Sequence, residues 1–240
     1  MSFRQFRSRL LWKLTAVFCV SFFSAYGSFG FCPQPNPTVA CEFLNSDAVF
    51  VGTVHSVRQV PPRGKEYDGW LYSLAVQELF RGPSSKTIAV FTENSSGSFP
   101  LDVGKQYLLF ASEVNGHLEI YNCGNSADSP TASVIRELRS LIIPKDAFIE
   151  GRISFSGIPD TGTHVSGMQV VIRSGSKIFK ATTDQDGWFH LHVPPGKYSA
   201  EILETPQWSF APYDLSYDNP EHFDARAGHC SGLQFVANSK

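Results

Sequence analysis

Apolar and polar side chains alternate along the first half of the chain, and this pattern predicts β-strands. Val49, Val51 and Thr53 fall on one face of segment 47–60, because successive side chains of a strand point to opposite faces. Segment 70–79 alternates in the same way. Three shorter apolar segments complete the expected strands: 86–92, 106–111 and 117–121. Turn-forming residues separate these segments, and Asn115-Gly116 is the strongest hairpin signal among them.

Two short helices are expected beside these strands. Asn36-Pro37 has the pattern of an N-cap followed by proline at the first helical position, which predicts a helix over residues 36–44. Ser129-Pro130 repeats that pattern, and four apolar residues follow at helical spacing: Val134, Leu138, Leu141 and Ile142. Five strands with flanking helices are the content of a small, partly open barrel of the OB type, which we expect over residues 32–145.

Residues 147–240 carry a second strand-rich pattern. Apolar segments separated by turn residues predict three strands in its first part: 148–154, 165–172 and 177–183. Segment 204–228 is rich in proline, aspartate and aromatic residues without periodicity, and it is predicted to be a long loop. Residues 230–236 are expected to form the last strand. The predicted fold class is therefore all-β in both halves of the chain.

The first 27 residues have the organisation of a secretory signal. A basic segment over 1–13 precedes an apolar run over 14–23, and small residues then place a cleavage site after Gly27. No later apolar stretch approaches the 18 residues of a membrane-spanning helix, so no membrane span is expected in the mature chain. The predicted location is secreted or periplasmic.

Charge narrows the possible partners. The chain has 240 residues with 20 Lys+Arg and 22 Asp+Glu, and 42% of it is hydrophobic, which is typical of a packed globular protein. The signal contains four of the basic residues and no acidic one, so the mature chain has 16 basic against 22 acidic residues. A net charge of −6 without basic clusters argues against nucleic acid, because phosphate binding requires clustered Lys and Arg.

Four cysteines remain after the signal, which contains Cys19. They are Cys32, Cys41, Cys123 and Cys230. In an oxidising compartment an even number of cysteines predicts disulfides, and four allow three connectivities.

The barrel half resembles the netrin-like module, the fold of the tissue inhibitors of metalloproteinases. Three segments carry the resemblance: Cys32-Pro33 to Val54, Gly104-Lys105-Gln106-Tyr107-Leu108-Leu109-Phe110-Ala111, and Tyr121-Asn122-Cys123. The resemblance implies that Cys32 pairs with Cys123. Cys41 and Cys230 are then left, and we expect them to pair across the two domains; the alternative is that one or both remain free and buried.

The second half is similar to the carboxypeptidase regulatory-like domain, a transthyretin-like β-sandwich related to the B-type repeats of collagen adhesins. The matching segments are Glu150-Gly151-Arg152-Ile153, Val165 to Ile172, Thr183 to Phe189 and Pro194 to Tyr198. The resemblance implies a sandwich over residues 147–240. Domains of this type space or stiffen proteins and have no catalytic role of their own.

The sequence favours a binding function over catalysis. It has no nucleophile elbow, no H-E-x-x-H motif and no phosphate-binding glycine loop, so we expect no enzyme and no cofactor. The expected function is that of a non-enzymatic extracytoplasmic binding or adaptor protein, with an unknown protein or glycan as partner. A metalloprotease inhibitor is the alternative, but it requires an N-terminal cysteine, and cleavage after Gly27 leaves four residues before Cys32. An accessory domain of an enzyme is the second alternative.

Two groups of residues are candidate sites. His190 and His192 lie two apart on an expected strand and share a face, so they could hold a metal if His222 or His229 supplied a third ligand; solvent-facing histidines are the alternative. Asp184-x-Asp186-Gly187 lacks the distal ligands of a calcium loop and predicts a turn. Five aromatic residues of the expected loop are a candidate binding surface, or alternatively a flap over the sandwich: Trp208, Phe210, Tyr213, Tyr217 and Phe223.

Overall fold

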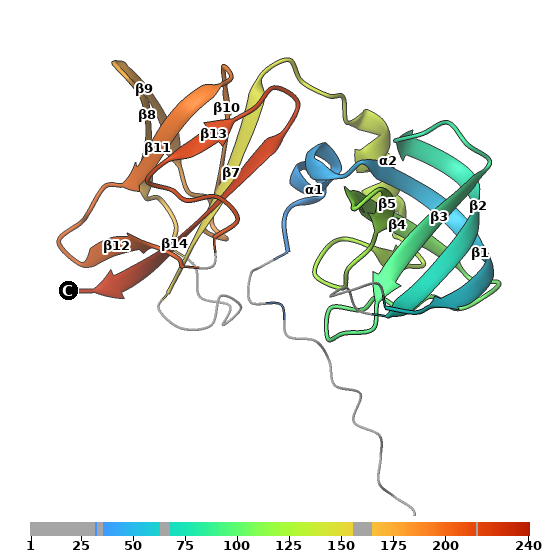
Figure 1. Ribbon diagram of the computed structural model, residues 1–240. Coiled ribbons are helices and arrows are strands. Elements are labelled where there is room, and N and C mark those ends of the chain that lie inside the picture. The colour runs from blue at the N-terminus through green and yellow to red at the C-terminus, as the bar shows by residue number, and fades with distance from the viewer. Residues whose placement is uncertain (1–31, 33–35, 63–67, 156–164, 215) are drawn as a thin grey trace, which may run out of the picture.

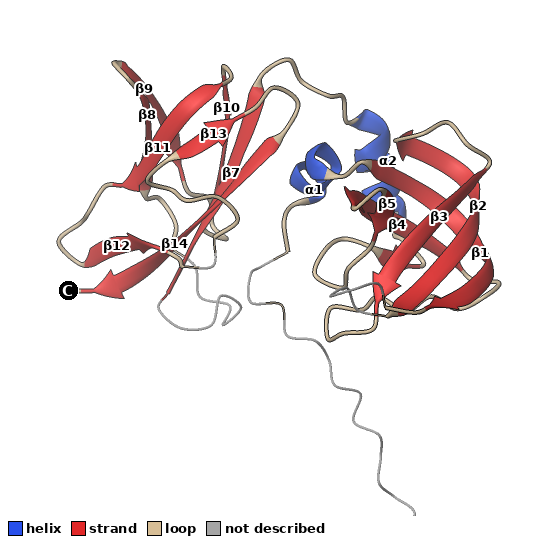
Figure 2. Cartoon of the chain, viewed as in Figure 1, coloured by secondary structure: helices blue, strands red, loops and turns tan. Residues whose placement is uncertain are grey.

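A computed structural model of the chain describes residues 32, 36–62, 68–155, 165–214 and 216–240. The expected signal over 1–27 lies outside the described residues. Strands form nearly all of the described secondary structure, with two short helices, so the predicted all-β class is confirmed (Figure 2). Figure 1 shows a barrel and a sandwich side by side, with both helices on the side of the barrel that faces the sandwich.

The barrel has five strands and is closed. The strands are β1 (Ala48–Val60), β2 (Gly69–Arg81), β3 (Thr87–Glu93), β4 (Gln106–Val114) and β5 (His117–Glu119). They pair in the order β1-β2-β3-β5-β4, and β4 pairs back with β1 to close the sheet on itself. The β3–β5 pair is parallel and the other pairs are antiparallel. A two-residue strand, β6 (Ala127–Asp128), extends the sheet beside β4. This is an OB-type barrel.

Alternation along the strands fills the interior of the barrel. Phe50, Leu74, Val90, Leu109 and Ile120 point inward and are fully buried in one cluster. The hairpin predicted at Asn115-Gly116 is confirmed: both residues have positive φ, 51° and 82°, as a type I′ turn requires.

The helices α1 (Val39–Asn45) and α2 (Ala132–Ser140) begin after the predicted caps. Thr38 is the N-cap of α1, and its hydroxyl accepts a hydrogen bond from the Cys41 amide at 3.2 Å. Thr131 caps α2 in the same way. The caps predicted at Asn36 and Ser129 are therefore wrong by two residues. In each case threonine follows the proline, and its side chain supplies the acceptor that a helix start needs.

Both helices cover the outer face of the barrel. Phe43 and Leu44 of α1 and Leu138 of α2 pack with Val49 and Phe110, whose side chains point out of the barrel. Cys230 and Phe148 of the sandwich join the same cluster. None of the described helices is long and apolar enough to cross a membrane.

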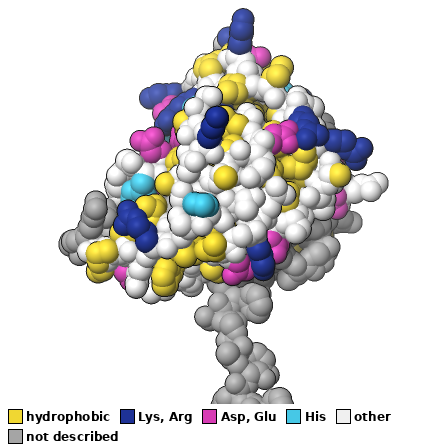
Figure 3. Space-filling view, turned by 90° about the vertical axis from the view of Figure 1, so that its right-hand side faces the viewer, with side chains coloured by type: hydrophobic (Ala, Val, Ile, Leu, Met, Phe, Trp, Pro, Cys, Tyr) yellow, Lys and Arg dark blue, Asp and Glu magenta, His cyan; other side chains and the backbone are white. Residues whose placement is uncertain are grey.

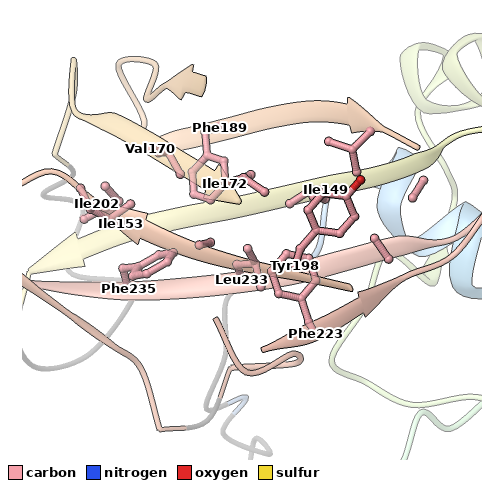
Figure 4. Packing of buried hydrophobic residues seen from close by; sticks show 14 of the residues in the cluster. Ile149, Ile153, Val170, Ile172, Phe189, Tyr198, Ile202, Phe223, Leu233 and Phe235 are labelled. Atoms are coloured by element: carbon pink, nitrogen blue, oxygen red, sulfur yellow. The ribbon is translucent and has the colours of Figure 1, made fainter. Parts of the chain in front are cut away.

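The sandwich has two four-stranded sheets. Its strands, besides two short ones described next, are β7 (Ala147–Phe155), β8 (Gln169–Ser174), β9 (Lys177–Thr182), β10 (Trp188–Val193), β11 (Gly196–Ile202) and β14 (Cys230–Ser239). The sheet orders are β10-β7-β14-β12 and β13-β11-β8-β9, and β7 and β14 are parallel. Figure 4 shows the side chains that fill the space between the sheets, including Ile149, Phe189 and Leu233.

The prediction of a long loop over 204–228 is wrong in part. This segment contains β12 (Trp208–Pro212), which pairs with the end of β14, and β13 (Phe223–Ala225), which pairs with β11. Both strands are short and lie at sheet edges. Their extended conformation is determined by pairing with β14 and β11, and their own sequences have no periodic pattern.

Two disulfides staple the fold. Cys32 is bonded to Cys123, and Cys41 of α1 is bonded to Cys230 of β14. The second bond spans 189 residues of chain and connects the barrel side to the sandwich. The alternative of free cysteines is therefore not realised in this structure.

Candidate functional site

A groove of about 500 Å³ lies on the outer face of the barrel. Its floor is a row of residues that face one another across four strands: Arg58 of β1, Leu71 of β2, Phe91 of β3 and Glu119 of β5. Paired residues of neighbouring strands point to the same face of a sheet. One row therefore presents a cation, two apolar side chains and a carboxylate. Figure 3, which views the molecule from the right-hand side of Figure 1, shows hydrophobic, acidic and basic side chains interspersed over that face.

A glycine makes room for the ring of Phe91 in the floor of the groove. Gly69 lies between Val60 and Glu93 in the next row, where it contributes no side chain. A Cβ atom on Gly69 would lie 2.6 Å from Cε2 of Phe91, so the phenyl ring occupies the space above this glycine. The close approach of the ring to the backbone explains why only glycine fits here.

A polar cluster forms one end of the groove. Glu119 is almost completely buried, and it accepts a hydrogen bond from the phenol of Tyr121. Its other carboxylate oxygen lies 2.7 Å from Nε2 of His117. The imidazole packs edge-on against Phe91 with ring centroids 5.2 Å apart. Nearby Glu93 accepts a hydrogen bond from Ser95 at 2.6 Å.

Burial raises the pKa of Tyr121 well above its ordinary range, and the hydrogen bond to Glu119 and the charges of Glu119 and Glu93 raise it further. The phenol therefore stays protonated and donates its hydrogen to the carboxylate. Glu119 is held between two donors, so the geometry of this end of the groove is fixed before any ligand binds.

The groove combines an aromatic floor with clustered hydrogen-bonding groups. An apolar ring face can pack against an apolar ligand surface, and carboxylate, phenol and amide groups can bind hydroxyl groups at its edge. On an OB barrel, the face of the second and third strands and the connections that flank it form the usual binding surface. The groove lies there, between Pro61 after β1 and Asn115 of the β4–β5 hairpin.

Sequence reasoning did not single out this polar cluster, although the sequence contained a signal for it. His117, Glu119 and Tyr121 are spaced two apart, so a strand places them on one face. Residue Glu93 lies on a different strand, and only the register of β3 with β2 and β5 brings it near them.

The five aromatic residues expected to form a binding surface do not lie together. Phe223 is buried in the sandwich core and stacks on Tyr198 at 6.0 Å, which makes it a core residue and corrects its predicted role. Trp208 packs against Phe155 at 4.7 Å, and Phe210 is partly buried against the same core. Tyr213 lies beside β14, where its amide donates to Gln234. Tyr217 remains 53% exposed.

The two candidate metal ligands lie on the outer face of the sandwich. His190 and His192 both pack on the ring of Phe148, with centroids 5.8 and 5.0 Å away. Among the described residues, one cluster has donor atoms close enough for a metal ion, namely Cys41, Glu150 and Cys230. Both of its sulfur atoms belong to the disulfide and are not thiolates. The side chain of Asp184 accepts from the amides of Asp186 and Trp188, so it shapes the predicted turn.

Comparisons with known proteins identify no relative whose functional site could be set beside this one. No family model and no curated protein matches the chain. The solved structures that match include the major pilin protein (T-13) from Streptococcus pyogenes serotype GAS131465. It is 12% identical, the match covers 82% of this chain and 92% of that chain, and the TM-score is 0.20. Nothing about the function of this chain follows from so distant a likeness.

Proposed function

We propose that this chain is an extracytoplasmic, non-enzymatic binding protein that holds an oligosaccharide in the groove of its barrel. The observation that carries the proposal is the registered row in which Phe91 lies beside Glu119, with His117 and Tyr121 fixed around the carboxylate. A sugar ring has apolar faces that pack on an aromatic ring and hydroxyl groups that bind carboxylates. The volume of about 500 Å³ is in the range of small-molecule sites.

Charge favours a saccharide over a nucleic acid in this groove. Arg58 is its one lysine or arginine among the described lining residues, whereas Glu93 and Glu119 are both acidic. A polyphosphate backbone would be repelled by the carboxylates and would lack the clustered cations that it needs. A neutral saccharide avoids both problems.

The cellular location is inferred from two observations. Residues 1–27 have the pattern of a cleaved signal, and disulfides such as the two in this chain persist in oxidising compartments. We also infer that the barrel is of the netrin-like type and the sandwich of the carboxypeptidase regulatory-like type, so that the chain has two domains. The motifs quoted for each half and the bond from Cys32 to Cys123 support this inference.

The experiment is binding of the full chain to an array of defined neutral oligosaccharides, followed by titration of any saccharide that binds. We expect Phe91→Ala and Glu119→Gln each to weaken binding at least about tenfold, the loss of one packed ring or one charged hydrogen bond. Arg58→Gln is a third variant, on an exposed side chain whose replacement leaves the barrel interior intact.

Val103→Ala is the matched control, because Val103 is an exposed apolar residue of the same barrel that does not line the groove. Its affinity should equal that of the wild-type protein. If no saccharide binds, or if binding survives all three groove variants, the assignment of the groove is wrong.

A further inference from the structure

The contact between α1 and the sandwich, here called the seam, is made by one face of the helix. Thr38, Cys41 and Asn45 are spaced by three and four residues, so they lie on the same side of α1 and its cap. Cys41 forms the disulfide with Cys230. The Asn45 side chain donates to the Cys230 carbonyl at 2.8 Å and accepts from the Cys230 amide at 2.9 Å.

Glu150 is the acceptor for Thr38 in this seam. It lies on β7, on the face opposite Ile149, and is only 2% exposed. One carboxylate oxygen accepts from the Thr38 amide at 3.0 Å, and the other accepts from the Thr38 hydroxyl. Nε2 of His190, on the neighbouring strand β10, lies 3.7 Å away.

A cleft of about 290 Å³ lies along the seam. Four carboxyl groups line it, and they come from different elements of the barrel and the sandwich: Glu42, Glu119, Glu150 and Asp218. No lysine, arginine or histidine is among its lining residues in the part of the chain that the structure describes. Two tyrosines, Tyr121 and Tyr217, line it as well. The described lining of the cleft is therefore acidic.

Glu42 is the carboxyl group of α1 that faces the barrel side of the cleft. One oxygen accepts from both the backbone amide and the side-chain amide of Asn125, each at 2.6 Å. Burial is the dominant influence and raises the pKa of Glu42 to about 7, against the lowering effect of these two hydrogen bonds. The residue is thus largely protonated in mildly acidic solution and ionises near neutrality.

Two other carboxyl groups shift in the same direction. Burial raises the pKa of Glu150, opposed by the hydrogen bonds from Thr38 and the charge of His190. Burial also raises the pKa of Asp218, opposed by the hydrogen bond from the Gly232 amide and the charge of Arg226.

The groups that face these carboxyls come from every element around the cleft. Tyr217 packs over Gly232, and burial raises its pKa, as do the charges of Glu42 and Glu150. Glu119 is bound by His117 and Tyr121 on β5 and the segment after it. The basic side chains near the cleft are therefore Arg226, close to Asp218, and two histidines: His117 beside Glu119 and His190 beside Glu150.

We propose that the seam is a pH-responsive joint: it is closed in mildly acidic solution and loosens as the pH rises and the cleft gains negative charge, while the Cys41–Cys230 disulfide keeps barrel and sandwich tethered. Opening exposes Glu150, which is 2% exposed in the closed seam, and gives water freer access to the half-buried Glu42 and Asp218. The cleft shares Glu119 and Tyr121 with the barrel groove, whereas Glu42, the residue on which the test of the joint rests, does not line the groove.

Linkage gives the sign and the size of the effect. A carboxyl with a raised pKa binds its proton more tightly in the closed form, so the closed form loses stability as pH rises from about 4.5 to about 7. If opening returns Glu42 alone to its ordinary value, the opening equilibrium shifts roughly twentyfold between about pH 5.5 and about pH 8. Glu150 and Asp218 add to this change in the same direction.

The reduction rate of the Cys41–Cys230 disulfide by a water-soluble phosphine measures opening directly. Cys41 and Cys230 are 3% and 6% exposed, so the reagent reaches them only when the seam opens. Alkylation and peptide mass spectrometry of the full chain report the rate, normalised at each pH to a small-molecule disulfide. We expect the normalised rate of the wild-type protein to rise roughly tenfold or more between about pH 5.5 and about pH 8. In Glu42→Gln this rise should be strongly reduced.

Glu221→Gln is the matched control, since Glu221 is exposed and does not line the cleft. It should behave like the wild-type protein. A pH-independent rate in the wild-type protein, or the same rise in Glu42→Gln, would overturn the proposal. If Glu42→Gln fails to fold, small-angle X-ray scattering of the wild-type protein decides: a larger radius of gyration at the higher pH supports the joint, and an unchanged one refutes it.

Discussion

Gly151 has a neighbour that leaves no room for a side chain, and Gly151→Ala tests that packing. The residue lies in β7, paired with Phe189 of β10 and Leu233 of β14. A Cβ atom there would enter the ring of Phe189 and would lie 2.9 Å from the carbonyl oxygen of Leu233. Phe189 is 1% exposed and lies in the core between the two sheets (Figure 4), so a shift of its ring would disturb other core residues.

The magnitude follows from the number of neighbours that must shift. Overpacking of a core costs about 1–3 kcal/mol, and one neighbour here is backbone, so the cost belongs at the upper end. Replacing a strand glycine by alanine returns about 0.5–1 kcal/mol by reducing the entropy of the unfolded chain. We therefore expect a net loss of about 2 kcal/mol in the free energy of unfolding of the sandwich.

Urea unfolding followed by tryptophan fluorescence measures this loss, because Trp188 adjoins Phe189 and Trp208 packs on the same core. The midpoint should fall by about 1 M or more with an unchanged slope. Gly196→Ala is the control in the same sandwich: the nearest atom to a Cβ there is 3.4 Å away. Its effect should be within about 0.5 kcal/mol.

A double substitution makes the test specific. Phe189→Leu shortens the side chain and should cost about 1 kcal/mol by itself. Adding Gly151→Ala to that background should cost much less than it does in the wild-type protein, with a coupling energy of about 1 kcal/mol or more. Additive effects, or a Gly151→Ala variant as stable as the control, would show that the ring of Phe189 does not limit this position.

Two further predictions concern the seam. Thr38→Ala removes the hydroxyl that caps α1 and that donates a hydrogen bond to buried Glu150. This variant should lower the free energy of unfolding by about 2 kcal/mol in urea titrations. Thr38→Ser keeps the hydroxyl and should match the wild-type protein. Replacing Cys41 and Cys230 together by serine removes a bridge that spans 189 residues and should destabilise the protein by about 4 kcal/mol. A midpoint unchanged under non-reducing conditions would mean that the bridge does not constrain the unfolded chain.

The strands of the barrel could be predicted because apolar residues recur along them with the period of a strand, although in β1 the helices bury the outer face as well. Val49, Val51 and Thr53 alternate with inward-pointing Phe50 in β1, and this pattern survives into the structure. Each helix begins two residues later than the Asn-Pro or Ser-Pro pattern predicts, because the threonine after the proline is the N-cap. A side-chain acceptor determines the cap, and Thr38 and Thr131 provide it.

The candidate sites were harder to predict than the strands, because tertiary contacts bring their residues together. The spacing of His117, Glu119 and Tyr121 was visible in the sequence, but their meeting with Phe91 required the parallel pairing of β3 with β5. By the period of a strand, Glu150 lies on the face opposite Ile149, away from the sandwich core. It is buried because α1, more than a hundred residues earlier, covers that face, and no local pattern encodes such a contact.

The long disulfide has a consequence for a chain that is cut by a protease. Because Cys41 is bonded to Cys230, a single backbone cut anywhere between them leaves both fragments covalently attached. A nicked molecule would keep the barrel groove and the sandwich in one particle, and the damage would appear only after reduction. The bond that tethers barrel and sandwich should therefore also hold a nicked chain together.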